Sequence, residues 1–365
     1  MHKISIFFIL ISLFGYSQRS SYSPYSYFGV GETNFSATVE NQMMGGNTAY
    51  YDSVHQNMNN AASMSKLKFV NYSIGVDLKN TSYLSESNNE SSTAAAINYI
   101  SVAIPTKVLS FSFGIKPKTS VGYLLENDDK TQSIAELNRF TGSGGISNAF
   151  VSVGFELFKN WGIGVSSSYA FGNLNHYHTK ILENIELYTR VSSESSVSGL
   201  DYNFSTVYQK TFNNKTTLYT SIVYQPEANY KSKNNQSIST INPNGNFGGD
   251  SEIIDLSAIG LDETNVKIPS SLSFGLGLGE DKKWYFGLNY LKTDEGGFKN
   301  ELMALDNVEF KSSQTFSVGG FYLPKYDSFT NYFKTITYRV GLRYKNGGLY
   351  VNDQQINEIG LNFGF

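Results

Sequence analysis

Apolar residues at every second position are the feature that most constrains what this chain can fold into. The carboxyl end shows it most clearly, where Ile359, Leu361, Phe363 and Phe365 are separated by glycine or asparagine. Successive side chains of a β-strand point to opposite faces, whereas a helix repeats its apolar face about every 3.6 residues. The C-terminal stretch is therefore predicted to be a strand with one apolar face and one small or polar face.

The same alternation recurs from residue 68 onward, in stretches that are joined by short turns. The short turns are predicted at residues 105–107, 158–160, 213–215, 279–283 and 323–324. Longer polar stretches, which we interpret as loops, lie at residues 79–93, 127–145, 173–197, 230–268 and 293–313. Short turns at one end and long loops at the other are typical of β-barrels of the bacterial outer membrane.

The composition fits strands that face lipid on one side and water on the other. Charged residues make up 16% of the 365 residues, whereas soluble domains contain about 25%. The hydrophobic share is 40%, and no internal run approaches the ~20 apolar residues of a spanning helix. The net charge of −3 does not indicate nucleic acid as a partner. The absence of cysteine excludes disulfides and thiol chemistry.

The amino terminus has the features of a secretory signal peptide, expected to span residues 1–18. Lys3 supplies the positive charge, residues 4–14 an apolar core and residues 15–18 a processing site. Export and insertion of a barrel predict an outer-membrane location, with outer-membrane lipid as its surroundings. The aromatic C-terminus resembles the recognition strand of outer-membrane barrels. Phe365 is therefore expected to be an assembly signal, read by the barrel assembly machinery during biogenesis.

The alternating stretches predict an all-β fold, a transmembrane antiparallel β-barrel of about 14 strands (12–16). Its last strand is expected to close against the first, near residues 70–78, because an open edge is not tolerated in lipid. A barrel of that size encloses a lumen, since only barrels of about 8 strands are filled by their own side chains. Residues 19–65 are polar and lack alternation, so they are expected to fill the lumen as a plug.

One N-terminal motif is similar to a known family. Residues 44–67 read MGGNTAYYDSVHQNMNNAASMSKL and resemble the N-terminal plug, or hatch, of FadL-like outer-membrane transporters for long-chain fatty acids and other hydrophobic compounds. The matching motif positions are Met44, Gly45, Gly46, Asp52, Asn60, Ala61 and Ala62. Ala61 stands where the family has proline. The stretch at 268–292 resembles the family's late hairpin, and the stretches at 140–157 and 337–344 resemble versions found in Bacteroidetes members.

This resemblance implies a monomeric barrel over residues 66–365 that is closed on its periplasmic side by a hatch over residues 19–65. Members of the family pass hydrophobic molecules through a lateral gap beside a kinked strand. Pro117 interrupts a predicted strand, where proline removes a ladder hydrogen bond. It is expected either to mark such a gap or to end the membrane part of its strand.

Few side chains offer site chemistry. Arg339 and Arg343 are expected to point into the lumen, where a guanidinium can bind the carboxylate of a ligand or of the hatch. We favour the hatch, with Asp52 as a candidate partner. His176 and His178 are too few for a metal site and are expected in a solvated loop. No metal, cofactor or catalytic group is expected, and the protein is not expected to be an enzyme.

Two functions are open from the sequence. The first is a FadL-like channel for passive uptake of hydrophobic small molecules such as long-chain fatty acids. The alternative is a FadL-type barrel that acts as a structural or accessory subunit of a larger outer-membrane secretion or assembly complex, with other outer-membrane proteins as partners. Ile253 and Ile259, in the stretch 230–268, favour the alternative because a partner could cover them, although they could also form a lid over a channel.

Overall fold

The computed structural model describes residues 22–35, 37–84, 89–129, 135–297 and 307–365. The expected signal peptide, residues 1–18, lies outside the described residues.

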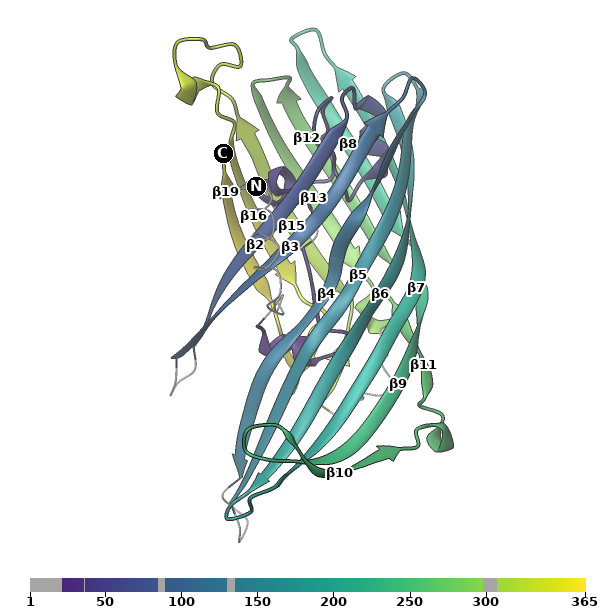
Figure 1. The fold of residues 1–365 in the computed structure, drawn as a ribbon. Helices are drawn as coiled ribbons and strands as arrows, with labels where there is room; N and C mark the ends of the chain where they lie inside the picture. The colour runs from purple at the N-terminus through teal and green to yellow at the C-terminus, as the bar shows by residue number, and fades with distance from the viewer. Residues whose placement is uncertain (1–21, 36, 85–88, 130–134, 298–306) are drawn as a thin grey trace, which may run out of the picture.

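The alternating stretches form one large antiparallel sheet, which curves round the N-terminal part of the chain (Figure 1). In the described part of the chain this sheet has sixteen strands, and twelve of them lie on one continuous path. In chain order, the strands of that path are β2 (Asn71–Leu84), β3 (Asn89–Pro105), β4 (Leu109–Asp129), β5 (Glu136–Phe158), β6 (Trp161–Leu182), β7 (Tyr188–Thr211), β8 (Thr216–Gln225), β12 (Ser271–Glu280), β13 (Trp284–Thr293), β15 (Ser313–Tyr322), β16 (Tyr338–Asn346) and β19 (Glu358–Gly364).

The remaining elements lie outside this path. Off the continuous path lie β1 (Glu32–Thr33), β9 (Ala228–Ile241), β10 (Phe247–Ile254) and β11 (Glu263–Ile268), and a second, small sheet contains β14 (Val308–Phe310), β17 (Leu349–Val351) and β18 (Gln354–Gln355). The helical turns are η2 (Pro24–Tyr27), α2 (Val39–Gln42), η3 (Ala61–Lys66), η4 (Ser257–Ile259), η5 (Glu295–Gly297) and η7 (Tyr332–Lys334). Among the described residues, no helix is long and apolar enough to cross a membrane.

Two prolines explain part of the difference between the twelve strands of the continuous path and the sixteen strands of the whole sheet. β11 pairs with β9 up to Ile268 and Ala228, and β12 pairs with β8 from Ser271 and Gln225 in the same register. Pro226 and Pro269 lie between these pairs, and proline has no N–H for the ladder. The expected number of about 14 strands falls between the twelve of the path and the sixteen of the whole sheet.

The interpretation of the long polar stretches as loops is wrong for most of their described residues; the stretch 293–313 is the exception, and its residues 298–306 lie outside the described residues. The stretch 173–197, for example, belongs mostly to β6 and β7, whose ladder continues as far as Lys180 and Thr189. These strands extend past the apolar band, where most residues are polar and the alternation disappears, although Leu174 and Val197 pack in a buried apolar cluster. The hydrogen-bonded ladder does not need that alternation, so the strands continue without a sequence signal.

The outer face of the sheet is apolar and exposed. Leu276 and Leu288 are paired neighbours on β12 and β13, and each is 50% exposed. On the opposite face of the same strands lie glycine, serine and asparagine, such as Gly275 and Asn289. An apolar outer face with a polar inner face is the arrangement of a sheet that is embedded in lipid.

The sheet divides between β3 and β4. Their ladder ends at Ile100 and Ile115, although each strand continues for many residues beside its other neighbour. The hairpin of β2 and β3 therefore diverges from β4, as Figure 1 shows. β1, from the N-terminal part of the chain, pairs with the edge of β4 that β3 leaves free.

Candidate functional site

Residues 22–68, which we call the N-terminal segment, pack against the polar inner face of the sheet. Their short helix η3 contacts β5 and β6, and η2 contacts β4. Farther round the sheet, the backbone at Met44 lies against β15 and β16. The expected plug residues therefore lie on the inner face of the sheet.

Glycines on the inner face make room for this segment. A Cβ on Gly164 would lie 2.8 Å from the Cα of Ala62, and one on Gly319 would lie 2.9 Å from the Cα of Met44. Real Cβ atoms do not approach backbone atoms so closely, so a larger residue at these positions would displace the segment.

The hatch motif residues are buried at these contacts. Met44 is 1% exposed, and Asn60 and Ala62 are fully buried. Gly45 and Gly46 have φ values of 73° and 80°, a left-handed conformation that glycine adopts without strain. They end helix α2, where the N–H of Gly46 donates to the carbonyl of Asn41 at 2.7 Å. The small residues of the motif thus permit close approach between two backbones.

Polar side chains fix the register of the segment on the sheet. The hydroxyl of Thr48 donates to Oδ1 of Asn289 at 2.6 Å and lies 2.9 Å from Oγ of Ser221. The hydroxyl of Tyr285 donates to Oδ1 of Asn47 at 3.0 Å. All these residues are buried, and each bond satisfies a buried oxygen, while Nδ2 of Asn47 has no partner.

Asp52 forms its ion pair within the segment. Its carboxylate lies 2.7 Å from Nδ1 of His55, and it accepts the N–H groups of Val54 and His55 at 2.8 and 2.6 Å. Burial alone would raise the pKa of Asp52, but the hydrogen bonds and the charge of His55 outweigh it and hold that pKa below its usual value. The hydrogen bond to Asp52 in turn raises the pKa of His55.

The two arginines expected in the lumen lie on the inner face but use different partners. Arg343 lies over the ring of Phe35 at 4.3 Å, and its Nη1 is 3.3 Å from Oε1 of Glu358 on β19. Arg343 thus contacts the segment through a ring and not through a carboxylate. Arg339 lines a cavity together with Asp52, but the closest partner of Asp52 is His55.

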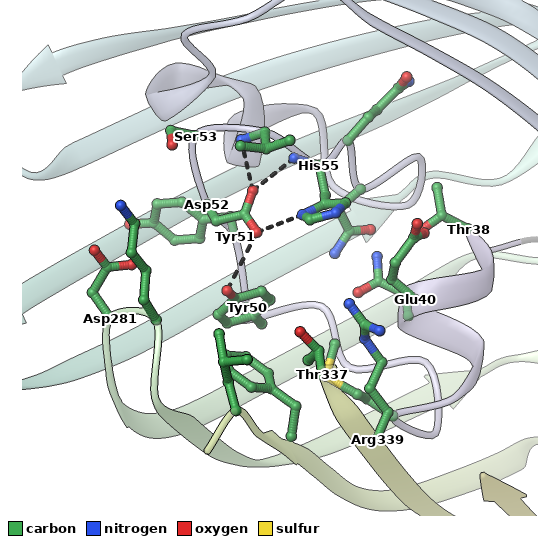
Figure 2. A pocket seen from close by; sticks show the side chains of 18 of the residues that line it. Thr38, Glu40, Tyr50, Tyr51, Asp52, Ser53, His55, Asp281, Thr337 and Arg339 are labelled. Carbon is green, nitrogen blue, oxygen red and sulfur yellow. Dashed lines mark hydrogen bonds and ion pairs between the residues drawn. The ribbon is translucent and has the colours of Figure 1, made fainter. Parts of the chain in front are cut away.

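This cavity is a feature that the sequence did not predict. It has a volume of about 210 Å³ and lies between the segment, the turn after β12 and the ends of β15 and β16 (Figure 2). Its polar lining includes Thr38, Gln56 and Arg339, each of which has a buried polar atom without a hydrogen-bond partner. Aromatic and aliphatic side chains form the rest of the wall, among them Tyr50 and Phe321.

Pro117 lies just past the point where β3 leaves β4. It pairs with Ser147 on β5, and the register shifts by a bulge between Pro117 and Thr119. On the inner face, Lys118 forms an ion pair with Asp201, which also accepts the hydroxyl of Tyr230. Nζ of its neighbour Lys116 donates to Oδ1 of Asn59 at 3.4 Å and lies 5.6 Å from the ring centroid of Phe150.

The expectation that His176 and His178 lie in a solvated loop is wrong. Both belong to strand β6, and His176 is only 8% exposed. Nδ1 of His176 lies 2.6 Å from the hydroxyl of Tyr123, and Nε2 of His178 lies 2.7 Å from Oδ1 of Asn138. Among the described residues, no group of three or more His, Cys, Asp or Glu side chains could hold a metal ion.

Phe365 lies apart from these contacts. It follows β19 at the end of the chain and is 87% exposed. The apolar residues of β19 are also exposed, on the outer face of the sheet. The expected assembly signal thus belongs to the lipid-facing surface.

Comparison with known proteins identifies both a family and a fold. The family model BamG matches residues 1–365. No curated protein matches the chain. Among solved structures, the CymD monoaromatic hydrocarbon channel is similar with a TM-score of 0.54 and 13% identity, over 89% of this chain and 87% of that one.

Two further solved structures have the same fold. A FadL homologue of Pseudomonas aeruginosa matches with a TM-score of 0.53 and 12% identity, over 88% of this chain and 82% of that one. The toluene transporter TodX of Pseudomonas putida matches with a TM-score of 0.50 and 13% identity, over 93% and 91%. The fold is therefore that of FadL-like outer-membrane proteins, as the N-terminal motif indicated, and with its apolar outer face the chain is an outer-membrane protein.

Proposed function

The chain belongs to the BamG family over its whole length, and we propose that it acts as an accessory subunit of the barrel assembly machinery of the outer membrane. The family match carries this proposal, because the name BamG associates the family with that machinery. The FadL-type fold alone does not choose a function, since one fold serves many.

Packing inside the sheet supports a role other than conduction. A cluster of buried side chains occupies the concave face of the long strands and includes Ile146, Leu174 and Tyr230, each at most 1% exposed. Val30 of the N-terminal segment packs into the same cluster. Side chains that fill the interior stabilise a rigid body, which suits a subunit that binds other proteins.

Exposed apolar residues at the long-strand end offer a surface for another protein. Ile253 on β10 is 82% exposed and Ile259 in η4 is 66% exposed. Isolated exposed apolar residues are common, but Ile253 belongs to β10, which pairs with β9 and extends the sheet at this end (Figure 1). In the accessory role they would be covered by a partner.

Purification from the native membrane in mild detergent tests the proposal. A tagged chain is expected to bring the conserved barrel-inserting subunit of the machinery with it, in a defined ratio. A tagged hydrocarbon channel of the same fold, produced in the same cells, is the matched control and should not. Recovery of the chain as a lone monomer would refute the accessory role.

We further propose that the sheet closes into a barrel, with β2 beside β19 and the N-terminal segment as its plug. Unpaired backbone groups in lipid cost several kcal/mol each, so two free edges would not persist in a membrane. The chain has no cysteine, which leaves a clean background for an engineered disulfide. A cysteine at Ser73 is expected to oxidise with one at Gly360 or Asn362, but not with one at Ser221. Absence of any β2–β19 disulfide would contradict closure.

A second candidate function is passive uptake of hydrophobic molecules. The divergence of β3 from β4 beside Pro117 favours it, because this is where a molecule could leave the interior sideways. Residues 22–34 occupy that edge, with the N–H of Ser23 donating to Gly122 and that of Asn34 to Lys118. Uptake of fatty acids or toluene should then fall when the chain is deleted. Unchanged uptake of both by the deletion strain would exclude this function.

A further inference from the structure

A cavity lies at the short-turn end of the sheet, away from the exposed residues of β10 and from the gap beside Pro117. It is bounded by the N-terminal segment on one side and by Asp281, Leu323 and Thr337 on the other. Figure 2 shows Asp52 and His55 above it, Glu40 at its side and Arg339 reaching in from β16. Because the short turns are the periplasmic end of such a barrel, the cavity faces the periplasm.

Its polar lining is incompletely satisfied. Oγ1 of Thr38 and Nε2 of Gln56 have no hydrogen-bond partner, and each of these residues is only 2% exposed. Nε of Arg339 and the hydroxyl of Tyr51, another lining residue, also have none. Buried polar groups in proteins are nearly always hydrogen-bonded, so four such atoms in residues around one cavity indicate a ligand that carries both donors and acceptors. A hydrocarbon cannot supply them.

The remaining wall is apolar and aromatic. The rings of Tyr50 and Phe321 pack with their centroids 5.1 Å apart, and Met44 and Leu323 continue the same wall. At the rim, Tyr326 is 60% exposed and lies under Nζ of Lys282, 4.3 Å from its ring centroid. A wall of this kind accommodates one large apolar side chain.

Charge and volume narrow the class of ligand. Glu40 and Asp281 oppose Lys282 and Arg339, while Asp52 and His55 neutralise each other, so the lining selects neither a simple anion nor a simple cation. The volume of about 210 Å³ exceeds that of several waters, each of which occupies about 30 Å³. It matches one bulky side chain with the peptide groups that flank it.

We propose that this cavity binds an extended peptide segment of a partner protein, with a large apolar side chain in the aromatic wall. The peptide carbonyls accept from Gln56 and Arg339, and a peptide N–H donates to Thr38. This assignment rests on the proposed function, because it gives the accessory subunit a docking site for a periplasmic partner in the machinery. A peptide supplies both polar backbone groups and an apolar side chain. An ion would leave the aromatic wall unfilled, and a hydrocarbon would leave the polar atoms without partners.

Peptide binding can be measured on the purified full chain in detergent. The probes are N-acetyl-glycyl-phenylalanyl-glycine amide and toluene, which share an apolar ring but differ in backbone. The peptide is expected to bind and toluene is expected not to compete with it. Binding of toluene alone would overturn the proposal in favour of an apolar ligand, and binding of neither would show that the cavity holds only water.

Thr38→Val provides the decisive variant. The hydroxyl of Thr38 has no partner within the protein and makes no cap bond to helix α2, so its loss removes no internal hydrogen bond. The fold is expected to be unaffected, while peptide affinity falls about fivefold, the effect of one hydrogen bond. Thr48→Val is the matched control, because the hydroxyl of Thr48 bonds Asn289 outside the cavity. It should lower stability and leave peptide affinity unchanged, and the reverse pattern would overturn the assignment.

Co-purification separates this inference from the proposed function. If Thr38→Val binds the peptide more weakly and also loses the partner, the cavity is the docking site. If the partner stays bound to Thr38→Val at wild-type yield, the cavity is not its docking site, although the accessory role stands. If the wild-type chain binds the peptide but recovers no subunit of the machinery, the accessory role fails and the peptide site stands.

Discussion

Replacing Gly341 with alanine is expected to displace the N-terminal segment from the sheet. A Cβ at this position would lie 2.6 Å from the carbonyl carbon of Met44 and 3.0 Å from the Cα of Gly45. Both atoms are backbone, so no side chain can rotate away to relieve the contact. The segment or the strand must move by several tenths of an ångström, or the segment must leave.

The size of the effect follows from the close packing of this contact. Overpacking by one methyl group costs typically about 1–3 kcal/mol. That range corresponds to a roughly 5- to 150-fold increase in the ratio of undocked to docked segment. Strand β16 stays folded whether the segment is docked or not, so the effect of Gly→Ala on the unfolded chain does not enter this ratio.

Chymotrypsin provides the assay, because Tyr51 is only 4% exposed while the segment is docked. Cleavage at Tyr51 requires undocking, so its rate in detergent reports the undocked population when undocking is fast and reversible. Gly341→Ala is expected to be cut about 10-fold faster than the wild-type chain. The barrel itself should keep its temperature of unfolding within a few degrees, as judged by heat-dependent mobility on gels.

Gly360→Ala is the matched control on the neighbouring strand. Gly360 pairs with Arg343, and the nearest atom to an added Cβ would be 4.0 Å away. This variant is expected to be cut at the wild-type rate. Equal cleavage rates for Gly341→Ala and the wild-type chain would refute the argument that glycines on the inner face make room for the segment.

Three further predictions concern the segment, the terminus and the gap. The lowered pKa of Asp52 stabilises docking above about pH 4, and the raised pKa of His55 stabilises it below about pH 6.5. Protection from chymotrypsin should therefore be greatest between these pH values and weaken on both sides. Asp52→Asn should flatten this pH profile. Phe365→Asp should lower the amount of folded chain in the outer membrane, and normal levels there would exclude an assembly role for Phe365. Ser120→Pro, which opposes Glu32 in the β1–β4 pairing, should release residues 22–34 to proteolysis while Thr48 still holds the rest of the segment; continued protection would show that this pairing contributes little.

Much of the fold follows from alternation alone. The apolar positions of β12 and β13 specify strands, their register and the face that meets lipid, because a slip by one residue would exchange the faces. The polar halves of β6 and β7 carry no such signal, because apolar residues such as Leu174 and Val197 are too few there to alternate, although both are buried. The sequence therefore predicted where these strands cross the membrane and not where they end.

The site was partly predictable. The motif around Met44 and Ala62 indicated a segment that belongs on the inner face, and the structure packs both residues there. A signal for its contacts was present in β6, where Gly162 and Gly164 occupy the inner positions between apolar residues. Glycine at successive inward positions indicates a close backbone neighbour.

The cavity could not be predicted, because it depends on how distant elements meet. Thr38 and Arg339 lie at opposite ends of the chain, and neither belongs to a pattern that pairs them. Asp52 likewise had candidate partners on the barrel, but its carboxylate forms an ion pair with the nearby His55 through a tight local turn. Local geometry of this kind decides ion pairs within irregular segments, where sequence periodicity gives no orientation.

The unequal strand lengths give the molecule a direction in the plane of the membrane. β7 has 24 residues, whereas β13 and β15 have 10 each. At about 3.3 Å per residue and a tilt near 40°, the long strands rise about 60 Å and the short ones about 25 Å, which is roughly the height of the apolar band. The long strands form a tall screen on one side, and the opposite side ends level with the membrane. A neighbouring protein can therefore extend over the short side at the extracellular surface, whereas on the tall side the long strands block it.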